Sequence, residues 1–249
     1  MNVSAITLDV DWAPDFVIEE VAQYLIDHGI KSTWFITHES DALKKLLRYP
    51  HLFEFGIHPN FLPGTTHGES EESVIRHLGA ITPKTNIVRT HALVQSSRLL
   101  HLLATEGYDV DLSLFLRETP NIEPHVLYVF DRAITRVPYF WEDDFDTYNP
   151  SRSWNSGDDK YHVSGLKIFN FHPMYIYLNM DTMHGYEALK RQRHLTDASH
   201  GDCQPYINQD KGVRTFFLGL LKDIQSRQGQ SYNVTELVTL WRRQAVSSP

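Results

Sequence analysis

Residues 3–11 read VSAITLDVD, an apolar stretch rich in β-branched residues that ends in two aspartates. A continuous apolar run of this kind is typical of a strand buried on both faces of a parallel sheet. Pro14 and Asp15 then supply a helix start, apolar residues follow at helical spacing, and Gly29 supplies a helix end. The first thirty residues therefore predict a strand followed by a helix, the repeating unit of an α/β fold.

The same pattern continues along the chain at intervals of about 25 residues. We predict further strands at 32–37, 53–58, 86–90 and 110–114, and helices at 41–47, 71–80 and 96–106. In the less regular second half we predict strands at 125–130, 134–141 and 166–171, helices at 213–224 and 235–243, and an irregular loop over 142–159. This alternation predicts an α/β fold with parallel strands joined by crossover helices.

The length and composition fit one large domain. The chain has 249 residues, of which 41 % are apolar and 12 % aromatic, so it can bury a full core. α/β barrels of this length fold as single units. Because the sequence shows no repeat, low-complexity tract or linker, we predict a single domain over residues 1–249.

The charge balance narrows the classes of partner. With 31 Asp and Glu against 23 Lys and Arg, the formal net charge is −8, which disfavours nucleic acid and anionic membrane surfaces. No apolar run approaches the roughly 18 residues of a membrane span, and the N-terminal residues lack the pattern of a signal peptide. Cys203 is the single cysteine and cannot form an internal disulfide, so the sequence gives no indication of an oxidising compartment. We expect a cytoplasmic protein, without membrane insertion, that acts on a small or locally anchored substrate.

Five ionisable residues fall at the ends of predicted strands: Asp9, Asp11, His58, Arg89 and His172. The carboxyl ends of parallel strands form the active face of α/β sheets and barrels, so these side chains are expected to meet there. Taken singly, each has a structural explanation, such as a helix cap for an aspartate or a core hydrogen bond for a histidine. The Asp9–Asp11 pair is harder to explain that way, because alternate residues of a strand point to one side and two close carboxylates need a cation or proton between them.

Short motifs in the same order resemble those of the polysaccharide deacetylase, or NodB-homology, family. TLDVD at 7–11 resembles the first motif in its Asp-x-Asp form, and STWF at 32–35 resembles the strand that follows it. FGIHPN at 55–60, VRTH at 88–91 and FNFHP at 169–173 resemble the second, third and last motifs. The segments around 57–64 and 169–179 are most similar to the branch that includes deacetylases from lipopolysaccharide O-antigen gene clusters.

The resemblance implies a fold, a reaction and residue roles. The family fold is a distorted parallel (β/α) barrel of about seven strands, and the family reaction removes an N- or O-acetyl group from a sugar with a divalent metal, usually zinc. By motif position, Asp9 resembles the general base, Asp11 and His58 the first metal ligands, Arg89 the residue that holds the base, and His172 the general acid.

The second motif departs from the family pattern. Four residues after His58 stands Leu62 instead of the usual second histidine ligand. His67, in the loop that follows, is our candidate for the third metal ligand, with Asn60 or a water as the alternative. Asn60 is otherwise predicted to bind substrate.

The third and fourth motifs also depart. His91 stands where a proline is common, close to the oxyanion donor expected near Ala92, and is predicted to contact substrate. No regular fourth motif is present. The segment Trp141-Glu142-Asp143 is the candidate for its apolar wall and for the acid that orients His172, with loop composition as the alternative explanation of these residues. Trp141 and Glu142 are predicted to bind substrate.

These residues suit amide hydrolysis on chemical grounds. A zinc ion with three protein ligands and an open position polarises a carbonyl and lowers the pKa of bound water to about 7. We therefore expect a metal-dependent deacetylase that acts on an acetamido or acetyl ester group of a sugar, free or carrier-linked, in cell-surface polysaccharide biosynthesis. The alternatives are a hydrolase of linear or cyclic non-sugar amides on the same fold and a catalytically degenerate glycan-binding module.

Overall fold

One nine-stranded sheet organises the structure, in the order β6-β7-β5-β4-β3-β2-β1-β9-β8. The computed structural model describes residues 1–228 and 230–247. The strands are β1 (Ser4–Asp9), β2 (Ser32–Ile36), β3 (Phe53–Ile57), β4 (Ile87–Val88), β5 (Val110–Asp111), β6 (His125–Val129), β7 (Arg132–Arg136), β8 (Trp141–Glu142) and β9 (Lys167–Phe171). All neighbouring pairs are parallel except β6 and β7, which form an antiparallel hairpin at one edge. The predicted α/β class with mainly parallel strands is confirmed.

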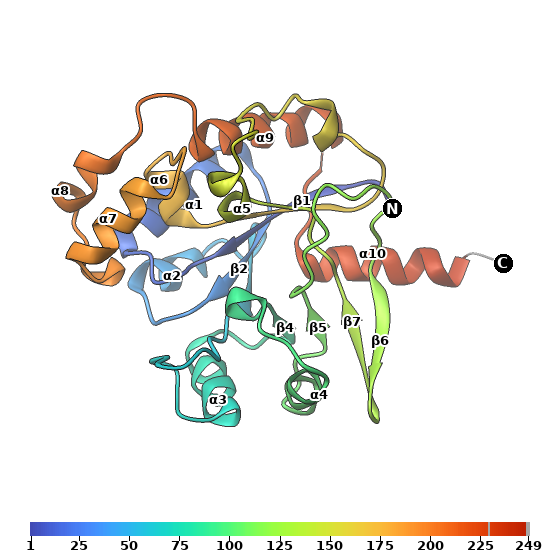
Figure 1. Cartoon of the computed structure of the whole chain (residues 1–249). Coiled ribbons are helices and arrows are strands. Elements are labelled where there is room, and N and C mark those ends of the chain that lie inside the picture. Colours follow the sequence, from blue (N-terminus) through green and yellow to red (C-terminus); the bar gives the residue numbers. More distant parts are fainter. Residues whose placement is uncertain (229, 248–249) are drawn as a thin grey trace.

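The sheet curls into a half-barrel (Figure 1). The chain between β7 and β8 draws its two edges together. On one side of this segment, Val137 donates its backbone N–H to Asp111 and Tyr139 donates to Leu114. On the other side, Phe140 donates to Ile168 of β9. The sheet is therefore the distorted parallel barrel that the sequence predicted, with nine strands where the resemblance implied about seven.

The helices surround this curled sheet (Figure 1). They are α1 (Asp15–His28), α2 (Asp41–Leu46), α3 (Glu71–Ile81), α4 (Ser97–Thr105), α5 (Asp143–Tyr148), α6 (Pro173–Tyr177), α7 (His184–Gln192), α8 (His200–Cys203), α9 (Val213–Gln228) and α10 (Val234–Ser247). The predicted end of α1 is confirmed, since Gly29 adopts the left-handed φ of 61° and returns its N–H to Ile26. No helix in the described part of the chain is long and apolar enough to cross a bilayer.

The C-terminal half contains more helix than the sequence predicted. The predicted loop over 142–159 is wrong at its start, where α5 forms, and the short helices α6, α7 and α8 were not predicted. The α7 sequence is strongly polar, so it lacks the apolar run that identifies a helix, and only Tyr186 and Leu189 of this helix are buried. Both α5 and α7 matter for function because they lie beside the carboxyl ends of the strands.

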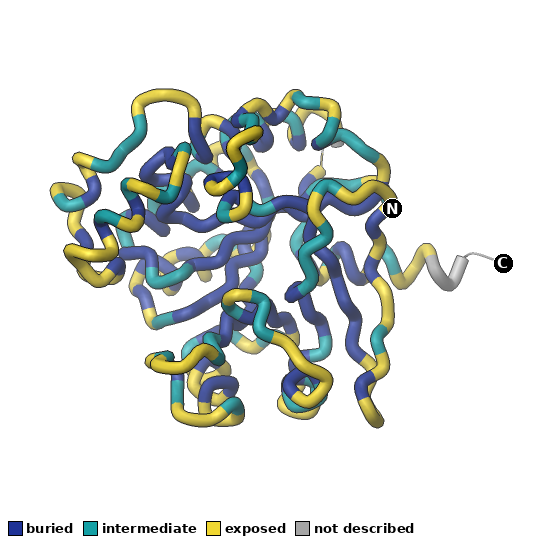
Figure 2. The backbone as a smooth tube through the Cα atoms, in the orientation of Figure 1, coloured by how far each residue is buried: buried dark blue, intermediate teal, exposed yellow. Residues whose placement is uncertain are grey.

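Burial follows the sheet. The strands β1, β2 and β9 are almost entirely buried, while exposure is concentrated on loops and the outer helix surfaces (Figure 2). Aromatic side chains fill the space between β9 and α9, where Trp141, Phe169, Phe171 and Phe216 pack with ring centroids 4.5–6.2 Å apart. Close packing of this kind makes the strand ends rigid. The polar residues that follow the strands are therefore held in fixed positions.

Candidate active site

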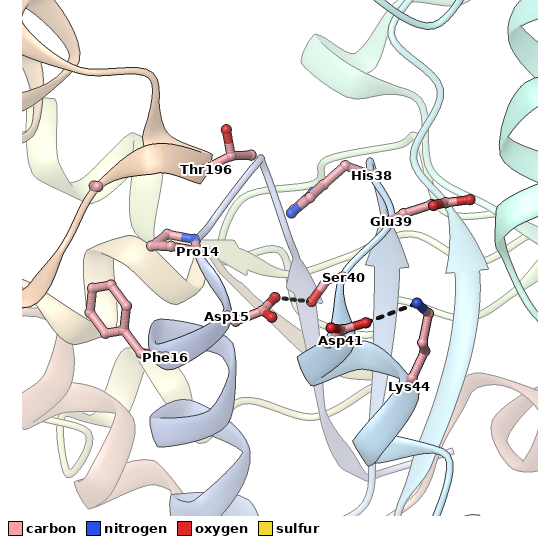
Figure 3. A pocket seen from close by; sticks show the side chains of 10 residues that line it. Pro14, Asp15, Phe16, His38, Glu39, Ser40, Asp41, Lys44 and Thr196 are labelled. Atoms are coloured by element: carbon pink, nitrogen blue, oxygen red, sulfur yellow. Dashed lines mark hydrogen bonds and ion pairs between the residues drawn. The ribbon is translucent and has the colours of Figure 1, made fainter.

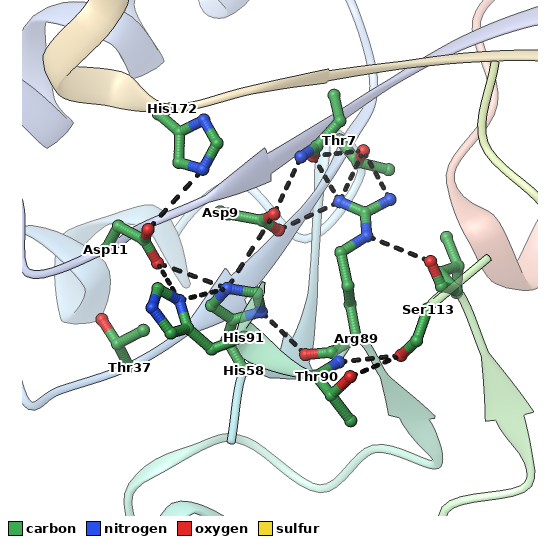
Figure 4. A network of polar contacts seen from close by, with 12 residues as sticks. Thr7, Asp9, Asp11, Thr37, His58, Arg89, Thr90, His91, Ser113 and His172 are labelled. Atoms are coloured by element: carbon green, nitrogen blue, oxygen red, sulfur yellow. Dashed lines mark hydrogen bonds and ion pairs between the residues drawn. The ribbon is translucent and has the colours of Figure 1, made fainter. Parts of the chain in front are cut away.

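The polar residues predicted at strand ends meet in one place (Figure 4). In the sheet, β9 lies beside β1, and β3 lies beside β4, with β2 between the two pairs. A cavity of about 280 Å³ opens at their carboxyl ends, and its lining includes Asp9, Asp11, His58, His91, Glu142 and His172. The structure thus brings together residues that are up to 163 positions apart in the sequence.

Asp9 is held by a buried hydrogen-bond network. Arg89 Nη1 donates to Asp9 Oδ1 at 3.0 Å, and Asn170 Nδ2 donates to Asp9 Oδ2 at 2.8 Å. The same guanidinium donates to Thr7 and to the Asn170 side-chain oxygen, and its Nε donates to the Leu112 carbonyl. Both oxygens of Asp9 therefore have fixed donors, and the carboxylate cannot rotate freely.

Arg89 is fully buried and lies between two aromatic rings. Its guanidinium carbon is 4.5 Å from the Phe35 ring centroid and 4.6 Å from that of Tyr139. Burial alone would raise the pKa of Asp9, but the charge of Arg89, followed by those of His58 and His172, lowers it below its usual value. Asp9 is thus an ionised carboxylate that faces the cavity.

Asp11 lies in a strained turn just beyond β1. Ala13 donates its backbone N–H to the Val10 carbonyl at 2.9 Å, and the two central residues, Asp11 and Trp12, have φ of 42° and 57°. Left-handed backbone costs a non-glycine residue about 1–3 kcal/mol and is concentrated at functional sites. The turn swings the Asp11 carboxylate back over the strand ends, toward the histidines.

Three side-chain atoms form a nearly equilateral triangle. Asp11 Oδ1 is 3.3 Å from His58 Nε2 and 3.3 Å from His91 Nδ1, and these two nitrogens are 3.3 Å apart. Ligands about 2.0–2.1 Å from a tetrahedral zinc are about 3.3–3.4 Å from one another, by the geometry of the tetrahedron. Within residues 1–228 and 230–247, this is the one cluster of His, Cys, Asp or Glu side chains with the spacing of a metal site.

Asp11 and His58 each turn one atom toward the centre of this triangle. His58 Nδ1 lies 2.7 Å from the Arg89 carbonyl, which can only accept, so Nδ1 donates there and Nε2 is the nitrogen that faces the triangle. Asp11 Oδ1 is buried and makes no conventional hydrogen bond. Burial would raise the pKa of Asp11, but His58 and His91 lower it well below its usual value. A carboxylate and two imidazoles in this arrangement fit a divalent transition metal.

His172 faces the same carboxylate from the other side of the cavity. Its Nε2 is 3.6 Å from Asp11 Oδ2, and its Nδ1 is 2.7 Å from Asp143 Oδ1. Asp143 Oδ2 also accepts the backbone N–H of His172 at 2.8 Å. Burial would lower the pKa of His172, but Asp143, with Asp11 and Asp9, raises it well above the usual value. His172 is therefore a protonated imidazolium whose Nε2–H faces the cavity.

Comparisons with known proteins identify the family of this chain. A family model described as WbmS-like polysaccharide deacetylase matches residues 6–190. The chain belongs to this family. No curated protein shows significant similarity.

Solved structures extend the comparison. A putative polysaccharide deacetylase involved in O-antigen biosynthesis from Bordetella bronchiseptica is 30 % identical, with 88 % of this chain and 90 % of that chain covered and a TM-score of 0.78. A 4-α-glucanotransferase from Thermococcus litoralis shares the fold, with 9 % identity, 96 % of this chain and 38 % of that chain covered and a TM-score of 0.52. A family 4 carbohydrate esterase from Bacillus anthracis aligns at 13 % identity, over 96 % of this chain and 83 % of that chain, with a TM-score of 0.48.

His67, our candidate for the third metal ligand, does not lie in this triangle. It is buried outside the triangle, and its Nδ1 accepts the backbone N–H of Asn60 at 3.1 Å. The ring proton therefore sits on Nε2, and neither nitrogen has a free lone pair for a metal. Burial lowers the pKa of His67 to about 4, so the ring is neutral. His91, which we predicted to contact substrate, lies where the third ligand is needed and replaces His67 in our assignment.

Two predicted substrate-binding residues lie away from the cavity. Asn60 points into its own loop, where its side-chain oxygen accepts the Leu62 backbone N–H at 2.9 Å. Trp141 is 1 % exposed and donates its indole N–H to Asp146 at 2.8 Å inside the aromatic core. The prediction that these two residues bind substrate is not supported by their positions. Trp141 belongs to strand β8, and its large apolar ring packs in the core.

Glu142 and Asp143, next in sequence, do face the site. Glu142 lines the cavity and accepts the Tyr139 hydroxyl at 3.0 Å, and burial raises its pKa to about 7. Of the candidate segment Trp141-Glu142-Asp143, Asp143 is the residue that bonds the His172 ring, at 2.7 Å. Burial raises the pKa of Asp143 to about 6, with His172 acting in the opposite direction. The proton shared by Asp143 and His172 lies mainly on the imidazole, because Asp143 accepts hydrogen bonds from both the backbone N–H and the ring Nδ1 of His172.

The sequence did not predict the rest of the cavity wall. It comes from α5 to α7 and includes Tyr148, Tyr175, Tyr186 and Lys190. Tyr175 packs against His172, with ring centroids 4.7 Å apart, and against Tyr186 at 4.8 Å. Several aromatic residues within 169–186 were a signal for such a wall, since sugar rings pack their C–H faces on aromatic side chains.

A larger hollow of about 600 Å³ lies beyond the Val10–Ala13 turn (Figure 3). Its charged side chains are mostly paired with neighbours: Ser40 donates to Asp15, and Lys44 pairs with Asp41 at 2.9 Å. It contains neither the metal-spaced cluster nor the acid and base. We therefore assign the chemistry to the smaller cavity.

Proposed function

We propose that this chain is a metal-dependent deacetylase that hydrolyses an acetamido or acetyl ester group on a sugar, with the metal held by Asp11, His58 and His91. The triangle of 3.3 Å separations between one carboxylate oxygen and two imidazole nitrogens carries the proposal. The deacetylase family membership supports the reaction class. The donor set suits zinc, and also cobalt or nickel.

The residues around the proposed metal have separate tasks. A divalent metal there would polarise the acetyl carbonyl and acidify a bound water. Asp9, held ionised by Arg89 and Asn170, would accept the proton of the attacking water as general base. His172, held protonated by Asp143, would donate a proton to the departing amine.

A backbone donor completes the proposed chemistry. Ala92 and Leu93 follow the third proposed ligand, line the cavity and have left-handed φ of 52° and 54°. Within this bend the Leu93 N–H donates to the Thr90 carbonyl at 3.1 Å. We propose the Ala92 N–H as the donor that stabilises the oxyanion of the tetrahedral intermediate.

The substrate proposal follows from the cavity and the relatives. A cavity of about 280 Å³ with tyrosines on its wall accommodates one acetamido sugar, free or carrier-linked. The Bordetella bronchiseptica relative is described as involved in O-antigen biosynthesis. By that similarity we propose a role in the biosynthesis of a cell-surface polysaccharide, with the cytoplasm as the compartment. A glycan-binding module without catalysis is disfavoured, since binding alone would not require a buried arginine on Asp9 and a buried aspartate on His172.

The test is metal content together with activity. The purified protein should carry close to one equivalent of a divalent transition metal after dialysis, and chelation should abolish deacetylation of an N-acetylhexosamine, with recovery on adding Zn²⁺. His58→Ala and His91→Ala should each lower metal affinity at least ~10-fold, the scale seen for weaker perturbations of metal sites. His101→Ala is the matched control, because His101 pairs with Asp131 on the surface. Unchanged metal content in both ligand variants would refute the assignment.

A further inference from the structure

The ring of Trp12 lies between the proposed metal ligand His91 and the buried His67. The Trp12 and His91 ring centroids are 5.4 Å apart in an edge-to-face arrangement. The Trp12 and His67 centroids are also 5.4 Å apart, with the two planes inclined by 31°. Trp12 is at the same time the residue next to Asp11 in the chain. It therefore contacts one proposed ligand through its ring and controls another through its backbone.

The backbone at Trp12 is costly for this residue type. Asp11 and Trp12 are the central pair of a tight turn in which both φ values are positive, a geometry that favours glycine and asparagine. A tryptophan there is strained, and it is anchored by its backbone N–H, which donates to Thr37 Oγ1 at 3.1 Å. Turn formation alone does not explain why an indole stands at this position. The contacts of its ring with His91 and His67 do explain it.

His67 is the fixed support behind that ring. It is 4 % exposed, and its Nδ1 is held by the Asn60 backbone N–H. His77 packs on His67, with ring centroids 5.8 Å apart. The rings of His77, His67, Trp12 and His91 contact one another in this order, from helix α3 to the proposed metal site. We call this row of rings the ring stack, although its last contact is edge-to-face.

We propose that Trp12 is a positioning residue for the metal site, and that His67 acts through it rather than as a ligand. The ring stack fixes the side chain of His91, and the strained turn fixes the carboxylate of Asp11, so that both keep their 3.3 Å separation. This inference rests on the proposed metal site. The second motif lacks its usual second histidine, and His67, in the loop that follows, supports the site without binding the metal.

The decisive variant is Trp12→Gly, because strain and positioning then act in opposite directions. Glycine relieves the left-handed backbone but removes an indole that packs against the core, so the melting temperature is measured beside the affinity to show that the variant is folded. Loss of the ring should lower the affinity for Zn²⁺, measured by competition with a chromophoric chelator, by about 10–100-fold. Trp12→Phe, which keeps an aromatic ring, should recover most of that affinity. Phe130→Gly is the matched control: Phe130 has φ of 53° in an exposed hairpin turn far from the site, and its replacement should leave Zn²⁺ affinity unchanged.

Two variants of His67 separate a support from a ligand. His67→Ala should weaken Zn²⁺ binding, whereas His67→Phe should retain most of it, because phenylalanine keeps the ring stack and has no nitrogen. The visible absorption of bound Co²⁺ should report a changed coordination geometry in His67→Ala and Trp12→Gly, and a near wild-type spectrum in His67→Phe. Equal loss in His67→Phe and His67→Ala would show that the ring nitrogens of His67 matter and its ring contact does not, and would overturn the proposal.

The outcomes also distinguish this inference from the proposed function. If the wild-type protein binds neither Zn²⁺ nor Co²⁺ tightly, the metal site itself fails, and the positioning proposal fails with it. If the wild type binds one equivalent, but Trp12→Gly binds it with equal affinity and an unchanged Co²⁺ spectrum, the metal site stands and only the role of Trp12 is refuted.

Discussion

Asp143 accepts two hydrogen bonds from His172, one from its backbone N–H at 2.8 Å and one from its ring Nδ1 at 2.7 Å. The first bond fixes the chain at the end of β9, and the second fixes the ring and its proton. Together they direct Nε2 of His172 toward the cavity and raise its pKa, against the effect of burial. The acid of the proposed reaction is therefore specified by a carboxylate 29 positions away in the sequence.

Replacing Asp143 by asparagine should change the pH profile as well as the rate. The pKa of His172 falls when this carboxylate is removed, so the protonated form is lost at a lower pH. We expect the alkaline limb of kcat to move to lower pH and kcat on an acetamido sugar to fall by about 10²–10⁴-fold. Asp144→Asn is the control, since Asp144 lines the same cavity but bonds Tyr175. A reduced kcat with an unshifted alkaline limb would show that Asp143 only supports the fold.

Arg89→Met tests the buried pair that holds Asp9. Removing the guanidinium leaves a carboxylate in the core without its cation, which is expected to cost about 3–5 kcal/mol of unfolding free energy. Adding Asp9→Asn should recover part of this loss, because no buried charge then remains. Denaturant unfolding of the two single variants and the double variant measures both effects. A single-variant cost below 1 kcal/mol would show that water reaches Asp9 and replaces the arginine.

The Asp9–Arg89 pair also sets an acid limit on stability. Because the pKa of folded Asp9 lies below that of the unfolded chain, about 3.9, its contribution is fully present above that pH and is lost as the pH falls through the folded value. Unfolding measured between pH 6 and pH 3 should show a steeper loss in the wild type than in the double variant.

The strand ends could be predicted from sequence because their signals are local. Asp9, His58, Arg89 and His172 each follow an apolar run, and parallel strands must bring such residues to one edge. Asn170 had a signal that we did not use: it is a polar residue inside the buried strand FNF, and its register partner in β1 is Thr7. Buried polar residues on adjacent strands commonly bond one another, as these do at 2.9 Å.

The proposed third ligand could not be predicted in the same way. His91 reaches the triangle through its Nδ1 at a bend after β4, in which Ala92 and Leu93 have left-handed φ. Neither alanine nor leucine predicts a left-handed backbone. In sequence His67 was as good a candidate for this ligand as His91, but its Nδ1 accepts a hydrogen bond from the Asn60 backbone N–H. The wall supplied by α7 was missed because this helix is short and polar.

Glu142 should make stability depend on pH near neutrality. Its folded pKa, about 7, lies above that of an ordinary glutamate, so its contribution is most favourable at low pH and is lost as the pH rises through 7. Glu142→Gln keeps the shape and cannot ionise. The difference in melting temperature between Glu142→Gln and the wild type should therefore grow in favour of the variant from pH 5 to pH 8. Glu187→Gln, at the exposed rim, is the control and should show no such trend.

His172→Ala distinguishes proton donation from a structural role. If His172 protonates the departing amine, the variant should lower kcat on an acetamido sugar by about 10²–10⁴-fold. An activated acetate ester has a leaving group that needs no proton, so its hydrolysis should be slowed far less. Metal content should stay the same, since His172 Nε2 is 3.6 Å from Asp11 Oδ2, on the oxygen that the proposed ligand triangle does not use. Equal losses on the amide and the ester, or loss of the metal, would place His172 in the support of Asp11 and would leave the reaction without its acid.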